Sequence, residues 1–505
     1  MPYTQLANLD FADIKASLVD YLRANSDFTD YDFEGSTLST MLDVLAYNTY
    51  YTAFNTNMVI NEMFLDSASL RDNVVSLAKQ IGYRPRSTTA PLAKLDFSIN
   101  YSGQGTIPTT CVLKRGTGFT TSFDDAIYQF VVVDDHEAPL NGNTASFGTV
   151  DVYQGTLIKQ SFTINTALKK QKFVLNNPGL DASTIKIRVY ENETSTSYET
   201  YDVADNILDL DSSSEVFFVE ETLDEQYELF FGDGVYGKKL QHNNFVEVTY
   251  VVTDGEDANG AKTFSFSGIL TSKTGTPFSF TPTVTTVSAA QGGAEIESVS
   301  SIKYSAPKTF AAQDRAVTQD DYASIVRKVF PATADIITFG GEQDDPPEFG
   351  KVKIAIKPKV GTALSSFTKQ DIVKKLRDYT IASVTPEIID PSILYIELSS
   401  VVSYKSSKTT ETKAEISKKV TTAVDEYTAS SQTEKFNGRF RHSRYAAVID
   451  GADPSISSNI TNVTLRKDFY PTLNSTFYYE LCFLNEFKDS CDDPVMKSTG
   501  FVVSE

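Results

Sequence analysis

Apolar residues recur at helical spacing throughout residues 1–90. Within each apolar stretch they fall three or four positions apart, which is typical of helices with one buried face. Asp10 stands where an N-cap is expected for the first helix, and Gly82 provides a stop signal after the last. Three helices are therefore predicted, over residues 11–24, 36–63 and 70–81.

The pattern changes near Leu92, where apolar and polar residues begin to alternate. The stretches LDFSINY, IKIRVY and VEVTYVV show the two-residue period of half-buried strands, and clusters of turn residues separate them. Because no long helical pattern intervenes, these strands favour an antiparallel, sandwich-like β region up to about residue 262. Residues 263–294 are rich in Ser, Thr, Gly and Pro, which indicates either an extended connector or strands that the pattern predicts poorly.

Strands and helices alternate in the last third of the chain. Thr318 stands three positions before Asp321, which is the spacing of a capping box, and the helix that follows ends before Pro331. Repeated strand–helix–strand units are typical of α+β modules of the split βαβ kind. The predicted fold class is therefore α+β and multidomain. The expected parts are a helical bundle region over 1–90, a β-rich middle domain over 91–262, a connector over 263–294, an α+β module over 295–400 and a carboxyl-terminal α+β module over 401–505.

The composition narrows the functional classes. Lys and Arg total 45 against 66 Asp and Glu, and the formal charge of −21 argues against nucleic acid as a partner, since a duplex binder needs a basic footprint. Cys111, Cys482 and Cys491 form no CxxC pair, which favours free thiols in a reducing compartment over disulfides or a zinc site. The amino terminus lacks the basic and apolar regions of a signal peptide.

No motif points to catalysis or to a bound cofactor. His136, His242 and His442 have no metal-ligand spacing, and neither an HExxH nor a GxSxG motif occurs. The stretch GDGVYGKK matches the nucleotide-binding pattern GxxxxGK, but Lys239 replaces the Ser or Thr that would bind magnesium. A strand-like stretch rather than a helix follows it, so a tight turn at Asp233–Gly234 explains the glycines better.

A calcium loop is not supported either. Acidic and hydroxyl side chains fall at loop positions one, three, five, seven and twelve, and these are Asp209, Asp211, Ser213, Glu215 and Glu220. The sixth position is Ser214, where an EF-hand loop requires glycine, and a strand rather than a helix is expected after it. The sequence therefore predicts no catalytic residue, no cofactor and no metal ligand, and it indicates a protein that is not an enzyme.

The predicted helix over 36–63 is unusual because it nearly lacks charge. Between Ser36 and Asn61 the only charged residue is Asp43, although a surface helix normally has a charged face. Its Thr and Asn residues would be costly in hydrocarbon, so a membrane span is not expected. We therefore expect that other protein segments, rather than lipid, cover this helix.

Two opposed faces of this helix are apolar. One carries Leu38, Met41, Leu42, Leu45, Val59, Ile60 and Met63, with Thr49, Thr52, Ala53 and Thr56 at its middle. The opposite face carries Tyr47, Tyr51, Phe54 and Met58. Asn48, Asn55 and Glu62, spaced seven apart, form a polar seam that can fix the register between packed helices. Two apolar faces are normally both buried, either by neighbouring helices and a partner subunit or at the centre of a large monomeric domain.

These residues carry a resemblance to a known family. The stretch FEGSTLSTMLDVLAYNTYYTAFNTNMVINEMFLDSASLRDNVVSLAKQIGYRP resembles the amino-terminal signature of the baseplate wedge protein of T-even-type contractile-tailed phages. FGDGVYGKKL, VEVTYVVTDGEDANGA and GGAEIESVSSIKYSAPKTFAAQDRAVTQDDY are similar to segments of the wider baseplate J-like family. FGKVKIAIKP and RFRHSRYAAVIDGADPSI resemble the T-even-type carboxyl-terminal region. T-even-type members tend to be longer, which leaves open whether a carboxyl-terminal piece is missing or naturally absent.

The resemblance implies a structural subunit of the tail baseplate in the virion, assembled in the host cytoplasm. Family members pair within a wedge, and the pairs join into a ring around the central hub that rearranges on tail contraction. Their amino-terminal helices bundle with another wedge protein near the sheath initiator, and their carboxyl-terminal domains contact other copies. Carried over to this sequence, the bundle contacts are expected at Leu38, Leu42, Leu45, Tyr47, Asn48, Phe54, Asn55 and Glu62.

Two other functional classes stay open from the residues alone. A tail-associated hydrolase acting on cell wall or polysaccharide would need a carboxylate pair, and no pair is singled out by its spacing. A host-binding tail adhesin would fit the Ser- and Thr-rich β region, but fibres usually trimerise through repeats and the sequence shows no repeat.

Overall fold

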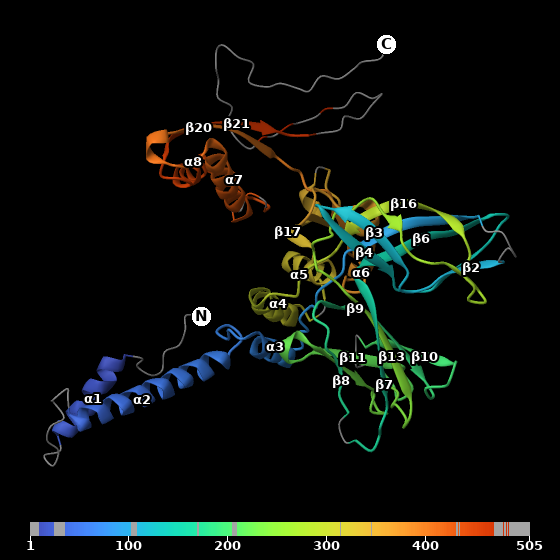
Figure 1. Cartoon of the computed structure of the whole chain (residues 1–505), viewed down its shortest axis with the longest axis horizontal. Coiled ribbons are helices and arrows are strands. Elements are labelled where there is room, and N and C mark those ends of the chain that lie inside the picture. The colour runs from blue at the N-terminus through green and yellow to red at the C-terminus, as the bar shows by residue number, and fades with distance from the viewer. Residues whose placement is uncertain are drawn as a thin grey trace, which may run out of the picture. The chain divides into compact units, whose positions relative to one another are not determined.

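The computed structural model describes most of the chain, which divides into two compact units (Figure 1). The described residues are 10–24, 36–102, 109–168, 171–204, 210–313, 315–344, 346–430, 433, 435–468, 478, 481 and 483. The first unit comprises Met1–Ala332, Thr338–Lys353 and Ser365–Glu387, and the second comprises Thr333–Ile337, Ile354–Leu364 and Ile388–Glu505. The chain therefore passes between the units more than once.

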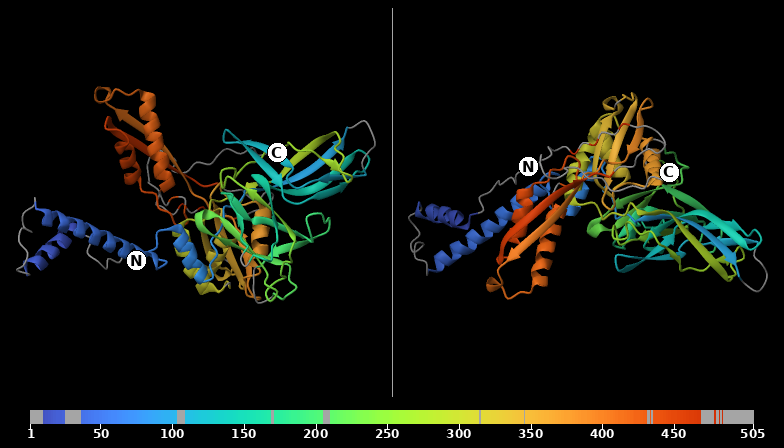
Figure 2. Two further views of the ribbon diagram at one scale, coloured as in Figure 1. Left: turned by 60° about the horizontal axis from the view of Figure 1, so that its bottom comes forward. Right: turned by 90° about the horizontal axis from the view of Figure 1, so that it is seen from above.

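The amino-terminal helices form where the sequence predicts them. They are α1 (Phe11–Arg23), α2 (Thr37–Glu62) and α3 (Arg71–Gln80). Asp10 caps α1 by accepting hydrogen bonds from the amides of Ala12 and Asp13, and Ser36 caps α2 by accepting one from the amide of Ser39. Both views of Figure 2 show α1 beside α2, and we call this pair the helical hairpin.

The third helix packs with a different group of elements. Val74, Val75 and Ala78 of α3 form an apolar cluster with Ile302 and Ala306 of α4 (Val299–Ala312). These side chains are almost fully buried, so α3 and α4 form one packed pair.

A six-stranded sheet in the order β14-β3-β4-β6-β1-β16 forms the first β domain. Its strands are β1 (Leu92–Tyr101), β3 (Gly118–Phe123), β4 (Ala126–Val132), β6 (Thr144–Gln154), β14 (Ser265–Phe266) and β16 (Phe280–Gln291). A smaller sheet in the order β15-β2-β5 contains β2 (Thr110–Leu113), β5 (His136–Pro139) and β15 (Thr271–Ser272). Alternate side chains enter an aromatic core, where the ring centroid of Phe97 lies 5.4 Å from that of Phe119 and 5.0 Å from that of Phe266.

Residues 263–294 contribute strands, which is the second of the two alternatives that the sequence left open for this stretch. β16 is 12 residues long and pairs antiparallel with β1, from Leu92 opposite Gln291 to Tyr101 opposite Phe280. Thr residues and Pro282 interrupt its apolar alternation, so the local pattern of a strand is weak. Pairing with a strand far earlier in the chain stabilises it instead.

A seven-stranded sheet in the order β7-β13-β9-β10-β11-β12-β8 forms the second β domain. Its strands are β7 (Thr156–Thr163), β8 (Phe173–Leu175), β9 (Leu180–Tyr190), β10 (Tyr198–Val203), β11 (Val216–Glu221), β12 (Tyr227–Phe231) and β13 (Phe245–Val252), with the short helix η2 (Leu223–Glu225). β10 and β11 pair in parallel, whereas the neighbouring pairs are antiparallel. Arg71 of α3 forms a 2.8 Å ion pair with Glu221 at the end of β11, so this sheet also anchors α3.

Helices and strands alternate after the second β domain. The elements are α5 (Gln319–Val329), β17 (Thr333–Gly340), η3 (Gly341–Gln343), β18 (Lys351–Pro358), α6 (Ser366–Leu376) and β19 (Thr385–Ile389), and the sheet order is β17-β18-β19. Thr318 and Asp321 form the predicted capping box before α5. The amide of Thr318 donates to Asp321 Oδ2 at 2.8 Å, and the amide of Asp321 donates to Thr318 Oγ1 at 3.3 Å.

The last described elements are a strand pair and two helices. They are β20 (Tyr395–Tyr404), η4 (Ser406–Lys408), α7 (Lys413–Ser430), α8 (His442–Gly451) and β21 (Ile456–Arg466), and β20 pairs antiparallel with β21. α8 packs on one face of the strand pair, where the hydroxyl oxygen of Tyr445 lies 3.2 Å from that of Ser400, and α7 packs beside α8. The predicted α+β multidomain fold class is confirmed.

Candidate functional site

The helical hairpin is the strongest candidate for a functional surface. α1 packs on one flank of α2, where Lys15 pairs with Asp43 at 2.6 Å and where Leu42 and Ala46 are buried. At about 100° per residue, Leu42 and Ala46 lie on the side of α2 roughly opposite Asn48 and Asn55. α1 therefore covers the flank between the two predicted apolar faces and leaves much of both faces in solvent.

Within the described part of the chain, both predicted apolar faces of α2 keep exposed side chains, although Leu42 of the first face is buried. Leu45 on one face is 52% exposed, and Tyr47 on the other is 55% exposed. We call the exposed apolar side chains of both faces the hairpin surface, and they are Met41, Val44, Leu45, Tyr47, Tyr51, Phe54, Met58 and Val59. Single exposed apolar residues are common, but a contiguous set on one helix marks an interaction site.

The predicted contact residues occupy different environments. Leu45, Tyr47 and Phe54 belong to the hairpin surface, and Asn48 and Asn55 are exposed beside them. Leu38 and Glu62 are half-buried, and Leu42 is buried under α1. Their role in binding a partner stays a prediction. The five exposed ones lie around α2 rather than on one side of it, because Leu45 and Phe54 are about 180° apart around the helix axis.

Threonine hydroxyls make the hairpin surface less polar than its composition suggests. The hydroxyl groups of Thr49, Thr52 and Thr56 each donate to the carbonyl oxygen four residues earlier, at 2.9, 2.9 and 2.8 Å. A hydroxyl bonded to its own helix no longer requires a hydrogen bond from water, and the methyl group remains. The small middle of the first face can therefore lose water at low cost.

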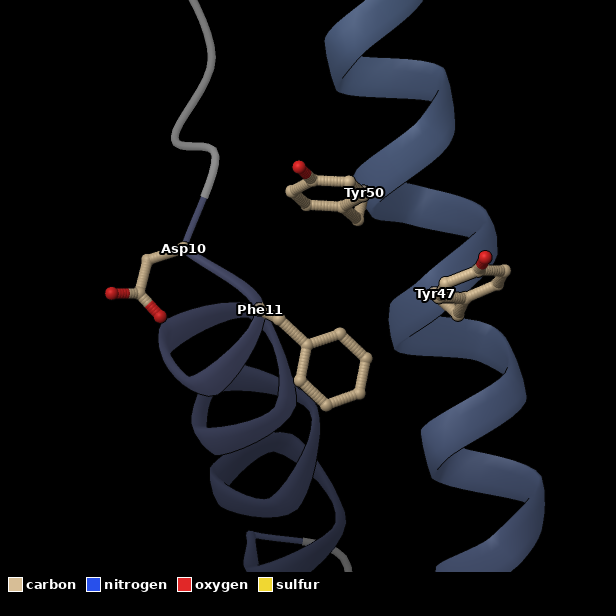
Figure 3. Close-up of a pocket in the computed structure, with 4 residues that line it drawn as sticks. All are labelled: Asp10, Phe11, Tyr47 and Tyr50. Carbon is tan, nitrogen blue, oxygen red and sulfur yellow. The ribbon is translucent and has the colours of Figure 1, made fainter.

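Aromatic side chains line a hollow between the two helices. An open depression of about 570 Å³ is lined by Asp10, Phe11, Tyr47 and Tyr50, and Figure 3 shows the rings of Phe11 and Tyr50 directed into the space between α1 and α2. The hydroxyl oxygens of Tyr47 and Tyr51 are 2.8 Å apart, and this hydrogen bond is the main cause that raises the pKa of Tyr47. The hollow can accept apolar side chains of a partner helix.

Glu62 has an intramolecular role that its place in the polar seam did not predict. Its carboxylate accepts hydrogen bonds from the amide and hydroxyl of Ser69, at 2.7 and 2.6 Å, and from the side chain of Asn73 at 2.9 Å. Leu70 precedes α3 and cannot cap it with its own side chain. No local sequence pattern signals this role of Glu62, because its partners lie seven to eleven residues further along the chain.

The glycine-rich motif GDGVYGKK forms a tight turn. Asp233 accepts hydrogen bonds from the amides of Val235 and Tyr236, and Gly237 has a φ of +87°. A Cβ on Gly232 would lie 2.2 Å from the carbonyl carbon of Gly237, so the close turn requires glycine. The predicted tight turn is therefore confirmed.

The acidic stretch that resembles a calcium loop forms a turn over its described part. The carboxylate of Asp211 accepts hydrogen bonds from Ser213 and Ser214, which lower the pKa of Asp211, whereas Asp209 lies outside the described residues. Within the described part of the chain, no three His, Cys, Asp or Glu side chains are grouped so that they could hold a metal ion. Cys111 is buried with a free thiol, and Cys482 and Cys491 lie outside the described residues.

Comparison with known proteins assigns a family. Four domain families of one baseplate protein match the chain in order. They are the helical domain of baseplate wedge protein gp6-like proteins over residues 10–83, the third domain of bacteriophage baseplate wedge protein gp6 over 158–253, and the carboxyl-terminal domains I and III of baseplate structural protein gp6 over 318–389 and 392–468. The chain belongs to the gp6 baseplate wedge family.

A relative found by its sequence agrees with this assignment. Baseplate wedge protein gp6 of Enterobacteria phage T4 is 29% identical over 511 residues, which cover 95% of this chain and 73% of that protein. A chain of the anti-feeding prophage baseplate also aligns, at 11% identity over 90% of this chain and 86% of its own length. Its TM-score is 0.33, which is too low to carry an argument. The chain is therefore a structural wedge component of a contractile phage tail baseplate.

The gp6 domains coincide with structural parts described above. The helical domain contains the hairpin and α3, and the third domain contains most of the seven-stranded sheet. Domain I extends from the start of α5 to the end of β19, and domain III contains β20, β21 and the two helices between them. The five-part division expected from the sequence remains a prediction.

The chain carries a second exposed apolar site in the part that matches domain III. Val401 and Ile460 stand directly opposite each other in the β20–β21 pair, and their side chains are 65% and 67% exposed. They lie on the face away from α8, and we call them the sheet patch.

Among the described helices, none is long and apolar enough to cross a membrane.

Proposed function

We propose that this gp6-family chain is a non-enzymatic scaffold whose hairpin surface joins a helical bundle with another wedge protein. The observation that carries the proposal is that most apolar side chains on both faces of α2 are not covered by the described residues. The bundle contacts would be made by the exposed Leu45, Tyr47, Asn48, Phe54 and Asn55, with the half-buried Leu38 and Glu62 at their edge. Leu42 is buried under α1 and would support these contacts without touching the partner. The sheath initiator would lie beside this bundle, as the family resemblance suggests.

The chemistry of the hairpin surface supports a helical partner. Tyr47, Tyr51 and Phe54 are aromatic anchors of the kind that dominate protein interfaces. The hollow between α1 and α2 is open and lined by aromatic rings, which suits side chains from the apolar face of another helix. Asn48 and Asn55 would then fix the register of the added helix.

Contacts between copies of this chain form the second part of the proposal. The sheet patch places two branched apolar side chains on an exposed sheet face, and neither is covered by the described residues. Two copies pairing there within the baseplate would link neighbouring subunits, and the linked pairs would form a ring around the hub. The ring would rearrange when the tail contracts, and assembly would take place in the host cytoplasm. No observation on the described residues favours the hydrolase or the adhesin.

Charge substitution on the hairpin surface tests the bundle. The full chain would be co-expressed with the other wedge proteins of the same phage, and the complex would be purified through a tag on the partner. Leu45→Glu and Phe54→Glu should each reduce co-purification at least about tenfold, because each buries an unpaired carboxylate at the interface. Ile127→Glu is the matched control, since Ile127 is 79% exposed on β4 of the first β domain.

Retention of the partner by both hairpin variants would overturn the bundle proposal. A loss with Ile127→Glu as well would also count against it, because the effect would then not be specific to the hairpin. Circular dichroism of each purified variant establishes that α2 is still folded.

A further inference from the structure

The segment between α2 and α3 is a tightly bonded connection. We call residues 63–70 the elbow, and their sequence MFLDSASL contains neither glycine nor proline. Within it, the amide of Ala68 donates to the carbonyl oxygen of Phe64 at 2.8 Å. Lys303 of α4 donates to the carbonyl oxygen of Asp66 at 3.2 Å. The elbow therefore has little of the conformational freedom of a flexible linker.

The far end of the elbow is packed against the α3–α4 pair. Ala68 is fully buried in the same apolar cluster as Val74 and Ile302, and Leu65 packs against that cluster. The carboxyl half of the elbow thus belongs to the body formed by α3 and α4.

The near end is bonded to α2 through two side chains. Ser67 donates its hydroxyl to the carbonyl oxygen of Asn61 at 2.6 Å. The carboxylate of Glu62 accepts hydrogen bonds from Ser69, at the end of the elbow, and from the side chain of Asn73 in α3. The amide nitrogen of Leu70 also lies 3.3 Å from Glu62 Oε2. One carboxylate thereby accepts the amides of the two residues before α3, Ser69 and Leu70, and a side-chain amide in the first turn of α3.

We propose that Glu62 is a positioning residue that clamps the elbow, so that the direction in which α2 leaves the α3–α4 pair is fixed before any partner binds. The clamp joins the last residue of α2 to the first turn of α3, across a segment with few other bonds to α2. A carboxylate at a helix amino terminus is also favoured by the helix dipole. Preorganisation of this kind lowers the conformational cost of later association.

The pKa of Glu62 agrees with this geometry. Burial alone would raise it, but the hydrogen bonds from Ser69, Asn73 and Leu70 outweigh burial and lower it to about 2. The charged form is therefore the one that the elbow stabilises.

Local opening of the elbow in the isolated full chain tests the clamp. Glu62→Ala should increase amide hydrogen exchange at residues 69–72, and cleavage by chymotrypsin after Phe64, by about five- to tenfold, since loss of the acceptor for the amides of Ser69 and Leu70 changes the opening equilibrium by about that much. Phe64 is 61% exposed, so the protease can reach it once the backbone opens. Asn55→Ala is the matched control, because Asn55 lies on α2 but makes no contact with the elbow.

The outcomes separate the clamp from a role in binding. Faster exchange and cleavage in Glu62→Ala, with Asn55→Ala unchanged, supports the clamp. Equal rates in Glu62→Ala and the wild type overturn it. If Glu62→Ala unfolds the chain, Asn73→Ala decides, because it removes only one donor: faster exchange at residues 69–72 supports the clamp and an unchanged rate overturns it. No partner protein is present, so the result is independent of the proposed bundle.

Discussion

The carboxylate of Glu62, the last residue of α2, forms hydrogen bonds that connect α2 with the start of α3. Its position seven residues after Asn55 suggests a member of a polar seam, whereas its oxygens accept hydrogen bonds from the residues that begin α3. Asn48 and Asn55 have no such partners and remain exposed. The three seam residues are therefore not equivalent, and only the two asparagines remain available to fix register with a partner.

The ionisation of Glu62 gives a prediction about acid stability. Its folded pKa of about 2 lies below the ordinary value of 4.5, so the opened elbow binds a proton at a higher pH than the folded elbow does. The stabilisation is therefore fully present above about pH 5 and is lost progressively as the pH falls from 4.5 to about 2. We expect the ratio of pepsin cleavage rates in the elbow, Glu62→Ala over wild type, to fall steadily between pH 4.5 and about pH 2. A ratio that does not change over this range would mean that the carboxyl group has the same pKa in the folded and the opened state.

Local chemistry made some residues predictable and not others. Asp10, Ser36 and Thr318 are caps because each accepts a hydrogen bond from an amide two or three residues later, and such spacing is visible in the sequence. The partners of Glu62 lie seven to eleven residues away, across a bend whose geometry no local pattern specifies. Single residues are thus predictable as far as their partners are sequence neighbours.

Among whole elements, helices were predicted better than strands. α2 and α5 have the predicted start because a cap and an apolar period coincide there. β16 has no such local signal, and its position depends on pairing with β1. Threonines in the middle of a strand face solvent as readily as the core, so alternation in this segment does not distinguish its faces.

The capping box of α5 gives a prediction at the scale of one element. Thr318→Ala removes the oxygen that accepts from the amide of Asp321, and it should lower the free energy of unfolding by about 1 kcal/mol. Urea denaturation followed by circular dichroism measures this difference. Thr318→Ser keeps the hydroxyl group and should lie within a few tenths of a kcal/mol of the wild type; an equal loss in both variants would assign the effect to the lost methyl group.

At the scale of the whole molecule, charge and apolar surface act in opposite directions. The formal charge of −21 makes copies of the chain repel one another, while the hairpin surface and the sheet patch favour contact. The hairpin surface carries no charged side chain, because Asp43 is paired with Lys15 on the flank of α2. Association is thus directed to the few places where the surface is both apolar and uncharged.

Salt dependence tests the proposed contact between copies. Raising the salt from 0.1 to 1 M shortens the screening length from about 10 to about 3 Å, so self-association through the sheet patch should become severalfold stronger. Sedimentation equilibrium of the full chain measures the dissociation constant. Val401→Glu should abolish the association at both salt concentrations, whereas Ile269→Glu, at a position that is 71% exposed in the first β domain, should leave it unchanged. Association that weakens with salt would indicate ion pairs instead.

The threonine hydroxyls that bond back onto α2 have a thermodynamic consequence. Water leaving Thr49, Thr52 and Thr56 does not have to be replaced by new hydrogen bonds, since each hydroxyl already donates to its own helix. Covering this face would then release mainly water that surrounds apolar groups, and the release of such water gives a large negative heat-capacity change. Wedge assembly through α2 would for this reason be driven by entropy near room temperature and would weaken in the cold.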